Sequence, residues 1–570
     1  MKENKNQKNT AVNQITEGVI WKQLLFFFFP ILFGTLFQQI YNTADTVVVG
    51  RFVGKEALAA VGGSSSMIVN LIVGFFVGLC SGAAVVISQF YGAKDHKNLK
   101  KALHTSMIFC LAASIIVGTA GFILAEPILY LMKTPAEVIP DSVLYLHIYF
   151  AGTFFNLVYN MVSSILRAVG DSKRPLYVLI ITCLLNILLD VVFVVIFHMG
   201  VLGVALATVS CQAVSAILVT WFLMRAEDIY RLEFHEIRFD LRSLGAVLRI
   251  GLPAGLESVM YNIANLTIQI FVNELGTDTV AAWGTLGKID AVFWMVCNAF
   301  AISITTFVGQ NYGAGKYHRM RKSVRVCMAM AYITAFIVSG AIVLFAGSIY
   351  RLFTTDQTVV KIGVHMIRFL IPSYALYVVI GILSGALRGA GRVLIPMILT
   401  CGGVCMIRII WLFAFVKSHP GINSIMLSYP VSWVITAVLF VIYYFRRFPG
   451  IQKKKYPYKK VLILRDSSDW HLCFSRKMSI YYELISLPEK RKSGILDAYR
   501  WIFKTAQKGM NHMHNLRKTI RYGILSILGV IVMGICMRYA IKTVMAAITA
   551  LTVGIRNRSG KRGGSHREEK

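Results

Sequence analysis

Two aspartates interrupt long apolar stretches in the first third of this 570-residue chain. Asp45 and Asp190 each lie fifteen positions after a proline, at Pro30 and Pro175. A helix rises about 1.5 Å per residue, so each carboxylate would lie about 22 Å along its helix from that proline. If these stretches cross a membrane, a charge within them is costly and becomes a candidate for function. We therefore predict that the two carboxylates lie at one depth and act together.

An amide and a hydroxyl are predicted at the same level. Asn186 precedes Asp190 by four positions and shares its helical face, while Thr208 lies on the next, oppositely directed stretch. Carboxylate, amide and hydroxyl oxygens suit Na⁺, and two neighbouring carboxylates suit a shared proton. We predict a cation-coupling site for H⁺ or Na⁺, which is a metal site if the ion is Na⁺, and no other cofactor. In the alternative interpretation each aspartate only caps a helix or pairs with Lys or Arg.

Further polar side chains at helical spacing are candidates for a substrate cavity. They are Gln38, Tyr41, Asn42, Asn156, Tyr159, Asn160, Glu257 and Asn262. Those of the fourth stretch could equally be hydrogen-bonding contacts between helices. Glu257 also has two open interpretations: it binds a cationic substrate or couples protons, or it pairs with Arg408 or Lys288.

The composition indicates that membrane helices position these residues. The chain is 56% hydrophobic and 15% charged, with a mean hydropathy of +0.63. Nearly uncharged stretches recur that are long enough to cross about 30 Å of hydrocarbon. We predict an all-α integral membrane protein whose twelve spans lie at 22–48, 57–90, 101–125, 141–166, 174–197, 202–225, 246–274, 280–310, 325–352, 362–388, 392–416 and 424–445.

Basic residues follow the even-numbered spans, whereas the odd-numbered loops are short and carry few or mixed charges. Clusters of this kind are Lys94 to Lys101 and Lys316 to Arg325. Because positive loops stay inside, we predict both termini in the cytoplasm of a multi-pass protein of a bacterial inner or plasma membrane.

The sequence repeats itself at a spacing of 221 positions. Gln89-Phe-Tyr-Gly corresponds to Gln310-Asn-Tyr-Gly, and the Leu-Arg-x-x-Gly element that begins at Leu166 corresponds to the one that begins at Leu387. Such a duplication predicts a transporter of two six-helix lobes with pseudo-two-fold symmetry. The predicted divisions are a cytoplasmic segment 1–21, an N-lobe 22–226, a connector 227–245, a C-lobe 246–447 and a basic cytoplasmic extension 448–570.

The predicted extension has a different composition from the lobes. From position 451 onward it holds 25 Lys and Arg against 7 Asp and Glu. An apolar segment at 522–555 could be an extra span, a helix on the membrane surface or a fused remnant. The extension contains no DNA- or RNA-binding motif, so we predict lipid but not nucleic acid as a partner.

These features together resemble the multidrug and toxin extrusion (MATE) family. The duplicated halves, the Asn42-x-x-Asp45 pattern and the paired Gln-x-Tyr-Gly loops carry the resemblance, which covers about residues 15–450. It implies two V-shaped lobes that alternate between outward- and inward-facing forms, and a monomer that exports small organic cations in exchange for H⁺ or Na⁺. It resembles the branch with an N-lobe aspartate site, which implies that role for Asp45, Asn186, Asp190 and Thr208.

The sequence leaves two other functions open. A flippase for a lipid-linked precursor would share the architecture but need basic groups along its path, and Lys288 and Arg408 are the chief cations within the spans. A membrane-anchored enzyme, or a nucleic-acid-binding sensor that uses the extension, would need a motif of known chemistry. The sequence contains no phosphate loop, zinc motif or paired-cysteine site, so we predict a protein that is not an enzyme.

Overall fold

The computed structural model describes residues 15–226, 228–233, 235 and 238–448 of the chain. All regular elements in these ranges are helices, as the composition predicts. They belong to one compact unit, residues 1–453. The predicted membrane-associated segment at 522–555 lies outside the described residues.

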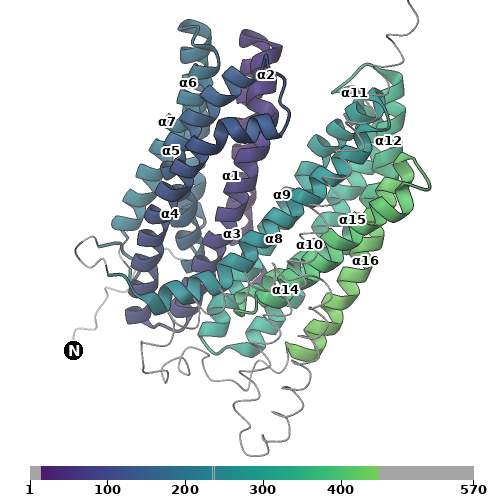
Figure 1. Cartoon of the computed structure of the whole chain (residues 1–570). Coiled ribbons are helices and arrows are strands. Elements are labelled where there is room, and N and C mark those ends of the chain that lie inside the picture. The colour runs from purple at the N-terminus through teal and green to yellow at the C-terminus, as the bar shows by residue number, and fades with distance from the viewer. Residues whose placement is uncertain (1–14, 227, 234, 236–237, 449–570) are drawn as a thin grey trace, which may run out of the picture. The chain divides into compact units, whose positions relative to one another are not determined.

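The first half of the described chain forms one group of helices, coloured purple to blue-green in Figure 1. Its elements are α1 (Ile20–Val48), the π-helical turn η1 (Val49–Val53), α2 (Lys55–Gly62), α3 (Ser64–Gly92), α4 (His96–Leu131), α5 (Ile139–Val169), α6 (Lys173–Asp190), the π-helical turn η2 (Val191–Ile196) and α7 (Gly200–Met224). We call this group the N-lobe.

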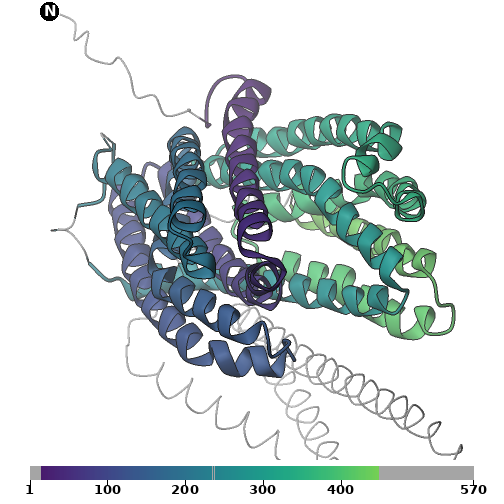
Figure 2. The ribbon, with the colours of Figure 1, turned by 90° about the horizontal axis from the view of Figure 1, so that it is seen from above.

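The second half forms the matching group, the C-lobe, coloured teal to green in Figure 1 and in the view from above in Figure 2. Its elements are α8 (Leu241–Asn273), α9 (Thr277–Gly313), α10 (Tyr317–Leu344), α11 (Ala346–Arg351), α12 (Gln357–Leu370), the 3₁₀ turn η4 (Ile371–Ser373), α13 (Tyr374–Gly389), α14 (Leu394–Thr400), the π-helical turn η5 (Cys401–Met406), α15 (Ile407–Trp411), the π-helical turn η6 (Leu412–Val416) and α16 (Ile422–Arg447).

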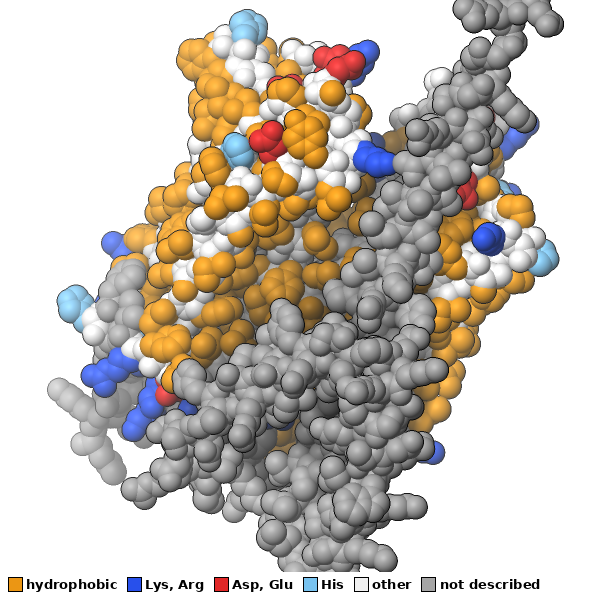
Figure 3. All heavy atoms as spheres, in the orientation of Figure 1, with side chains coloured by type: hydrophobic (Ala, Val, Ile, Leu, Met, Phe, Trp, Pro, Cys, Tyr) orange, Lys and Arg blue, Asp and Glu red, His pale blue; other side chains and the backbone are white. Residues whose placement is uncertain are grey.

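The helices have the length and composition of membrane spans. Eleven helical segments of the described chain are long and apolar enough to cross a bilayer. The seventh predicted span, α8, is not among these eleven: it has 33 residues but also carries charged and polar side chains such as Arg249 and Glu257. On the face shown in Figure 3, apolar side chains cover the sides of the described helices, while charged side chains lie mainly towards their ends. This distribution suits a surface in contact with lipid.

The predicted second span is bent rather than straight. Helix α2 ends at Gly62 and α3 begins at Ser64, with Gly63 between them. The Gly63 amide donates a hydrogen bond to the Ala59 carbonyl at 2.9 Å, and a Cβ at this glycine would collide with the same oxygen. A glycine therefore permits a bend that hydrophobicity did not reveal.

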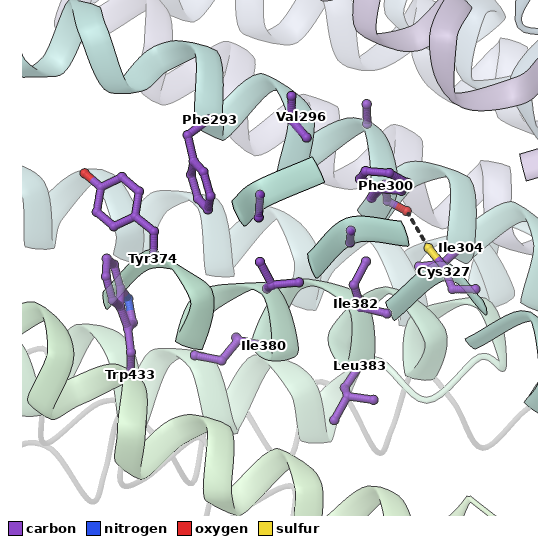
Figure 4. Packing of buried hydrophobic residues seen from close by; sticks show 14 of the residues in the cluster. Phe293, Val296, Phe300, Ile304, Cys327, Tyr374, Ile380, Ile382, Leu383 and Trp433 are labelled. Carbon is purple, nitrogen blue, oxygen red and sulfur yellow. Dashed lines mark hydrogen bonds between the residues drawn. The ribbon is translucent and has the colours of Figure 1, made fainter. Parts of the chain in front are cut away.

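Aromatic and aliphatic side chains fill the interior of the C-lobe. Phe293, Val296 and Phe300 of α9 face α13 and α16, from which Tyr374 and Trp433 approach each other (Figure 4). Tyr374 and Trp433 are both 1% exposed, and their ring centroids lie 5.6 Å apart. The interior of this lobe is therefore packed tightly around large rings.

The two lobes meet most extensively where α3 crosses α8. A Cβ at Gly78 would collide with the backbone of Gly255, and a Cβ at Gly82 would lie 2.5 Å from the Gly251 nitrogen. Glycines on both helices thus allow the backbones to touch, which is a common way for membrane helices to associate without a hydrophobic driving force.

The repeated sequence elements bind each other across the lobes. The Gln89 side-chain amide donates to the Gly389 carbonyl at 2.8 Å, and the Gln310 amide donates to the Ala168 carbonyl at 2.7 Å. Residues 89 and 310 are repeat equivalents at the 221-residue spacing, and so are 168 and 389. Each lobe therefore gives the other the same hydrogen bond, and we call this pair of bonds the glutamine clasp.

Candidate functional site

The structure brings the four predicted coupling residues together inside the N-lobe. Asp45 lies near the end of α1, Asn186 and Asp190 lie on α6, and Thr208 lies on α7. All four are buried: Asp45 is 8% exposed and Thr208 2%, while Asn186 and Asp190 are fully enclosed. The expected common level of the two carboxylates therefore agrees with their placement, whereas their role in ion coupling stays a prediction.

The polar atoms of this cluster lack regular partners. The Asp45 carboxylate faces the side chains of Asp190, Asn186 and Thr208 at close range. No pair among them reaches regular hydrogen-bond geometry, and both Asp190 oxygens, the Asn186 amide and the Thr208 hydroxyl are buried without a partner. Buried polar groups are normally satisfied, because leaving one unpaired costs about 1–3 kcal/mol. The cluster therefore has hydrogen-bonding capacity that the surrounding side chains do not use.

Local helix irregularities lie beside both carboxylates. The α-helical pattern of α1 changes to the π-helical turn η1 four residues after Asp45, and α6 changes to η2 directly after Asp190. π-helical turns inside helices are frequent at functional sites, because they shift the direction of the following side chains. The α1 helix also contains Pro30, which removes a backbone hydrogen bond. The direction of the chain can therefore change at Pro30 within α1 and at η1 directly after it, on either side of Asp45.

A cavity of about 390 Å³ opens beside the cluster in the N-lobe. This is within the range of small-molecule sites. Seven of the predicted residues line it: Gln38, Tyr41, Asn42, Asp45, Asn156, Tyr159 and Thr208. Asn186 and Asp190 are not among the lining residues, so they form the layer behind Asp45 and Thr208.

Sequence reasoning missed several polar residues of the cavity wall. They include Asn70, Tyr145, Tyr149, Thr182, Gln212 and Ser215. Tyr145 and Tyr149 on α5 are four positions apart and so share a face, which is the same signal that identified Asn156 and Asn160. Gln212 lies one turn beyond Thr208 on α7 and could have been found in the same way.

Three predicted cavity residues lie elsewhere. Asn160 does not line the cavity, and its side-chain amide donates to the Asn156 carbonyl at 2.9 Å. Asn262 and Glu257 lie on α8 in the C-lobe, where the Asn262 amide donates to the Ser258 carbonyl at 3.0 Å. Five of the eight candidate substrate-cavity residues thus line this cavity, and these three do not.

Glu257 forms an ion pair, but with neither of the expected partners. Its carboxylate lies 2.9 Å from Nη2 of Arg388, whereas the prediction named Arg408 or Lys288. Arg388 belongs to the repeated Leu-Arg-x-x-Gly element at the end of α13, and its Nε donates a hydrogen bond to the Ser384 hydroxyl. Glu257 lies near the middle of α8, and spacing along the sequence could not show that its carboxylate reaches the end of α13.

The N-lobe cluster fits a small cation better than a resident transition metal. No group of three or more His, Cys, Asp and Glu side chains gathers anywhere in the described residues. The cluster instead offers two carboxylates with one amide oxygen and one hydroxyl. Hard oxygen donors of this kind suit an alkali cation or a proton.

Comparison with known proteins decides the family. The MatE family model matches residues 30–192 and 253–413, which together make up more than half of the 570 residues. The chain belongs to the MatE family. The two matched ranges coincide with the two halves of the internal repeat.

The chain is similar to curated MATE proteins along most of their length. It is 28% identical over 451 residues to the probable multidrug resistance protein YoeA of Bacillus subtilis, and the match covers 77% of this chain and 96% of the relative. It is 25% identical to the probable multidrug resistance protein NorM of Thermotoga maritima, with 70% of this chain and 86% of the relative covered.

A solved structure shares the fold of this MATE chain. It is described as the outward-facing conformation of a multidrug resistance MATE family transporter. The TM-score is 0.74 at 22% identity, and the match covers 79% of this chain and all of that one. The twelve-helix, two-lobe architecture predicted from the repeat is thereby confirmed.

Proposed function

We propose that this MATE protein is a secondary active antiporter that exports organic cations in exchange for H⁺ or Na⁺. The observation that carries the proposal is the enclosed N-lobe cluster, whose two carboxylates lie beside a cavity of about 390 Å³ and whose polar atoms lack partners. The names of the curated relatives, which are multidrug resistance proteins, support drug export as the transport activity.

The proposed cycle couples the two cations through their preference for different conformers. H⁺ or Na⁺ that enters from outside binds Asp45 and Asp190 and neutralises the cluster. Helix α1 then bends near Pro30, the cavity contracts and the organic cation leaves outward. When the protein opens to the cytoplasm, the coupling ion leaves and the carboxylates regain their charge. The exchange requires that the two ligands stabilise opposite states.

We further propose a monomer in a bacterial inner or plasma membrane, with both termini in the cytoplasm. The basic loops after the even-numbered spans support this orientation. The apolar side chains exposed along the helices, such as Phe26, Ile116 and Phe336, support contact with lipid. We place the protein among transporters and not among enzymes, because the relatives are named as multidrug resistance proteins.

The described residues do not favour a flippase for lipid-linked precursors. Such a path would need free basic groups to bind a pyrophosphate. Arg388 is paired with Glu257, Arg408 lies over the ring of Tyr429, and Lys288 lies on α9 of the C-lobe and does not line the N-lobe cavity. The N-lobe cavity has no Lys or Arg among its lining residues. A cationic substrate suits this wall better than an anionic one.

Ethidium efflux from energised membrane vesicles tests the proposal. A pH jump and a Na⁺ jump, applied separately, should identify the coupling ion. Asp45→Asn should reduce gradient-driven efflux at least ~10-fold, because it removes one of the two carboxylates whose charge the coupling ion neutralises. Asp278→Asn is the matched control, because Asp278 is an exposed acid at the start of α9. Wild-type efflux in Asp45→Asn at equal membrane abundance would refute the assignment.

A further inference from the structure

The repeat places a second, very different cluster in the C-lobe. Gly200 begins α7 and Gly421 directly precedes α16, and they lie 221 positions apart, as the other repeat anchors do. At this spacing Thr208 corresponds to Tyr429 and Gln212 corresponds to Trp433. A polar wall of the N-lobe cavity is therefore replaced in the C-lobe by two aromatic rings.

Three further aromatic residues of the C-lobe stand at repeat positions that are not aromatic in the N-lobe. Val73, Thr153 and Asn156 of the N-lobe correspond to Trp294, Tyr374 and Tyr377 of the C-lobe. These aromatic residues pack on Trp433: its ring centroid lies 6.2 Å from that of Trp294, 5.6 Å from that of Tyr374 and 5.8 Å from that of Tyr377. Figure 4 shows Tyr374 and Trp433 against each other. We call Trp294, Tyr374, Tyr377, Tyr429 and Trp433 the aromatic box.

A guanidinium lies against this box. Arg408 is 3% exposed, and its guanidinium carbon lies 3.9 Å from the ring centroid of Tyr429 and 5.8 Å from that of Trp433. Its Nε is buried without a hydrogen-bond partner, and no ion pair involves Arg408 within the described residues. Asp290, the acid in this region, accepts hydrogen bonds from Trp294 and Tyr374 instead. The rings are therefore the main stabilising contact of the charge.

The position of Arg408 in the repeat relates its contact with the rings to the N-lobe cluster. It corresponds to Ile187, the residue directly after Asn186 of the N-lobe cluster. It lies on α15, a short helix with a π-helical turn on either side, η5 and η6. The equivalents of Asp45, Asn186 and Asp190 are Leu266, Ile407 and Trp411, so the C-lobe lacks both carboxylates and carries a positive charge next to the Asn186 equivalent. A charge buried inside a membrane protein is expensive and marks a functional position.

We propose that Arg408 is a tethered cation, which occupies the C-lobe equivalent of the N-lobe cation site and confines cation binding to the N-lobe. The faces of aromatic rings attract guanidinium and quaternary ammonium groups, so an aromatic box without Arg408 would bind such ligands. The native side chain fills the box and repels a second cation. Arg408 is in this sense a residue that determines specificity. This inference deepens the proposed antiport, since it assigns both the coupling ion and the organic cation to one lobe.

Chemical rescue of purified, full-length Arg408→Ala protein tests this proposal. Methylguanidinium carries the group that the substitution removes, and urea is its neutral counterpart of similar shape. Methylguanidinium should quench the tryptophan fluorescence of Arg408→Ala saturably and raise its thermal stability, while urea should do neither. The half-saturating concentration should be at least ~10-fold lower than for the wild type, a difference of about 1.4 kcal/mol. Arg408→Lys, which keeps a tethered cation, should behave as the wild type does.

Two further results sharpen the test. The double variant Arg408→Ala, Trp433→Ala should lose the methylguanidinium response, because a main ring of the box is gone. If Arg408→Ala does not accumulate alone, methylguanidinium in the growth medium should restore its yield, and urea should not. Equal responses to methylguanidinium and urea, in binding or in yield, would overturn the proposal. These readouts need no transport, so a failure of the antiport proposal would leave them unchanged and distinguishable.

Discussion

Breaking the glutamine clasp should open the lobes at one end. In Gln310→Ala the Ala168 carbonyl loses its 2.7 Å hydrogen bond, and in Gln89→Ala the Gly389 carbonyl loses the bond of 2.8 Å. Both glutamines are almost fully buried, so each substitution leaves an enclosed carbonyl unpaired. This costs about 1–3 kcal/mol, which shifts the balance between closed and open lobes about 5- to 150-fold.

The clasp lies next to the loops predicted to be cytoplasmic, since Lys94 follows Gln89 by five positions. Opening there should therefore favour the inward-facing form in the proposed cycle. Because the repeat relates the two bonds, the two single variants should give effects of similar size. The double variant should shift the balance further, by up to about the sum of the two free energies.

Distances between spin labels in the two lobes measure this shift. Lys97 on α4 and Lys322 on α10 are exposed lysines, one in each lobe, and suit labelling after replacement by cysteine. The variants should populate a longer distance that is minor in the wild type. Gln269→Ala is the control, because the Gln269 amide donates to Asn273 within α8, at 2.8 Å, and bridges no lobes. Identical distance distributions for the wild type and the double variant would refute the reasoning.

Three other perturbations have defined outcomes. Glu257→Gln should lower thermal stability in detergent by up to about 3 kcal/mol, because it leaves the Arg388 charge unpaired. The double variant Glu257→Met, Arg388→Met should recover most of that loss. Equal stability of the single and double variants would argue against the ion pair. Burial raises the pKa of Asp171, in the loop after α5. The stability of the protein should therefore fall as pH rises from about 3.9, the usual pKa of Asp, through the raised pKa of Asp171. Asp171→Asn should make the melting temperature less dependent on pH in this range. Deleting residues 452–570 should leave ethidium efflux per folded molecule unchanged, and lost efflux would give the extension a part in transport.

The N-lobe cluster could be predicted because its geometry depends on short-range rules. Pro30 and Pro175 gave a common reference level, and a constant rise per residue carried that level to Asp45 and Asp190. The helices α1 and α6 pack against each other, so equal depth led to proximity. The unpartnered state of the polar atoms could not be predicted, because it depends on side-chain directions to within tenths of an ångström.

The partner of Glu257 shows where such rules stop. Arg388, Arg408 and Lys288 lie on three different helices, and charge alone does not choose among them. The choice depends on the rotation of α8 about its axis, which is set by contacts such as those of Gly251 and Gly255 with α3. Sequence reasoning favoured residues in the middle of spans, whereas the true partner lies at the end of α13.

The two halves of the chain share the same backbone turns and inter-lobe hydrogen bonds, but their interiors are lined by different side chains. Gly170 and Gly391 both end a helix with positive φ, at 104° and 75°, and Gln89 and Gln310 make equivalent hydrogen bonds. Those positions tolerate little change, because backbone approach or a left-handed turn requires them. An interior wall has no such constraint, and Thr208 in one lobe can correspond to Tyr429 in the other. Duplication thus supplies a symmetric frame for the two lobes, while in the proposed cycle their asymmetric filling would let one lobe alone bind the coupling ion.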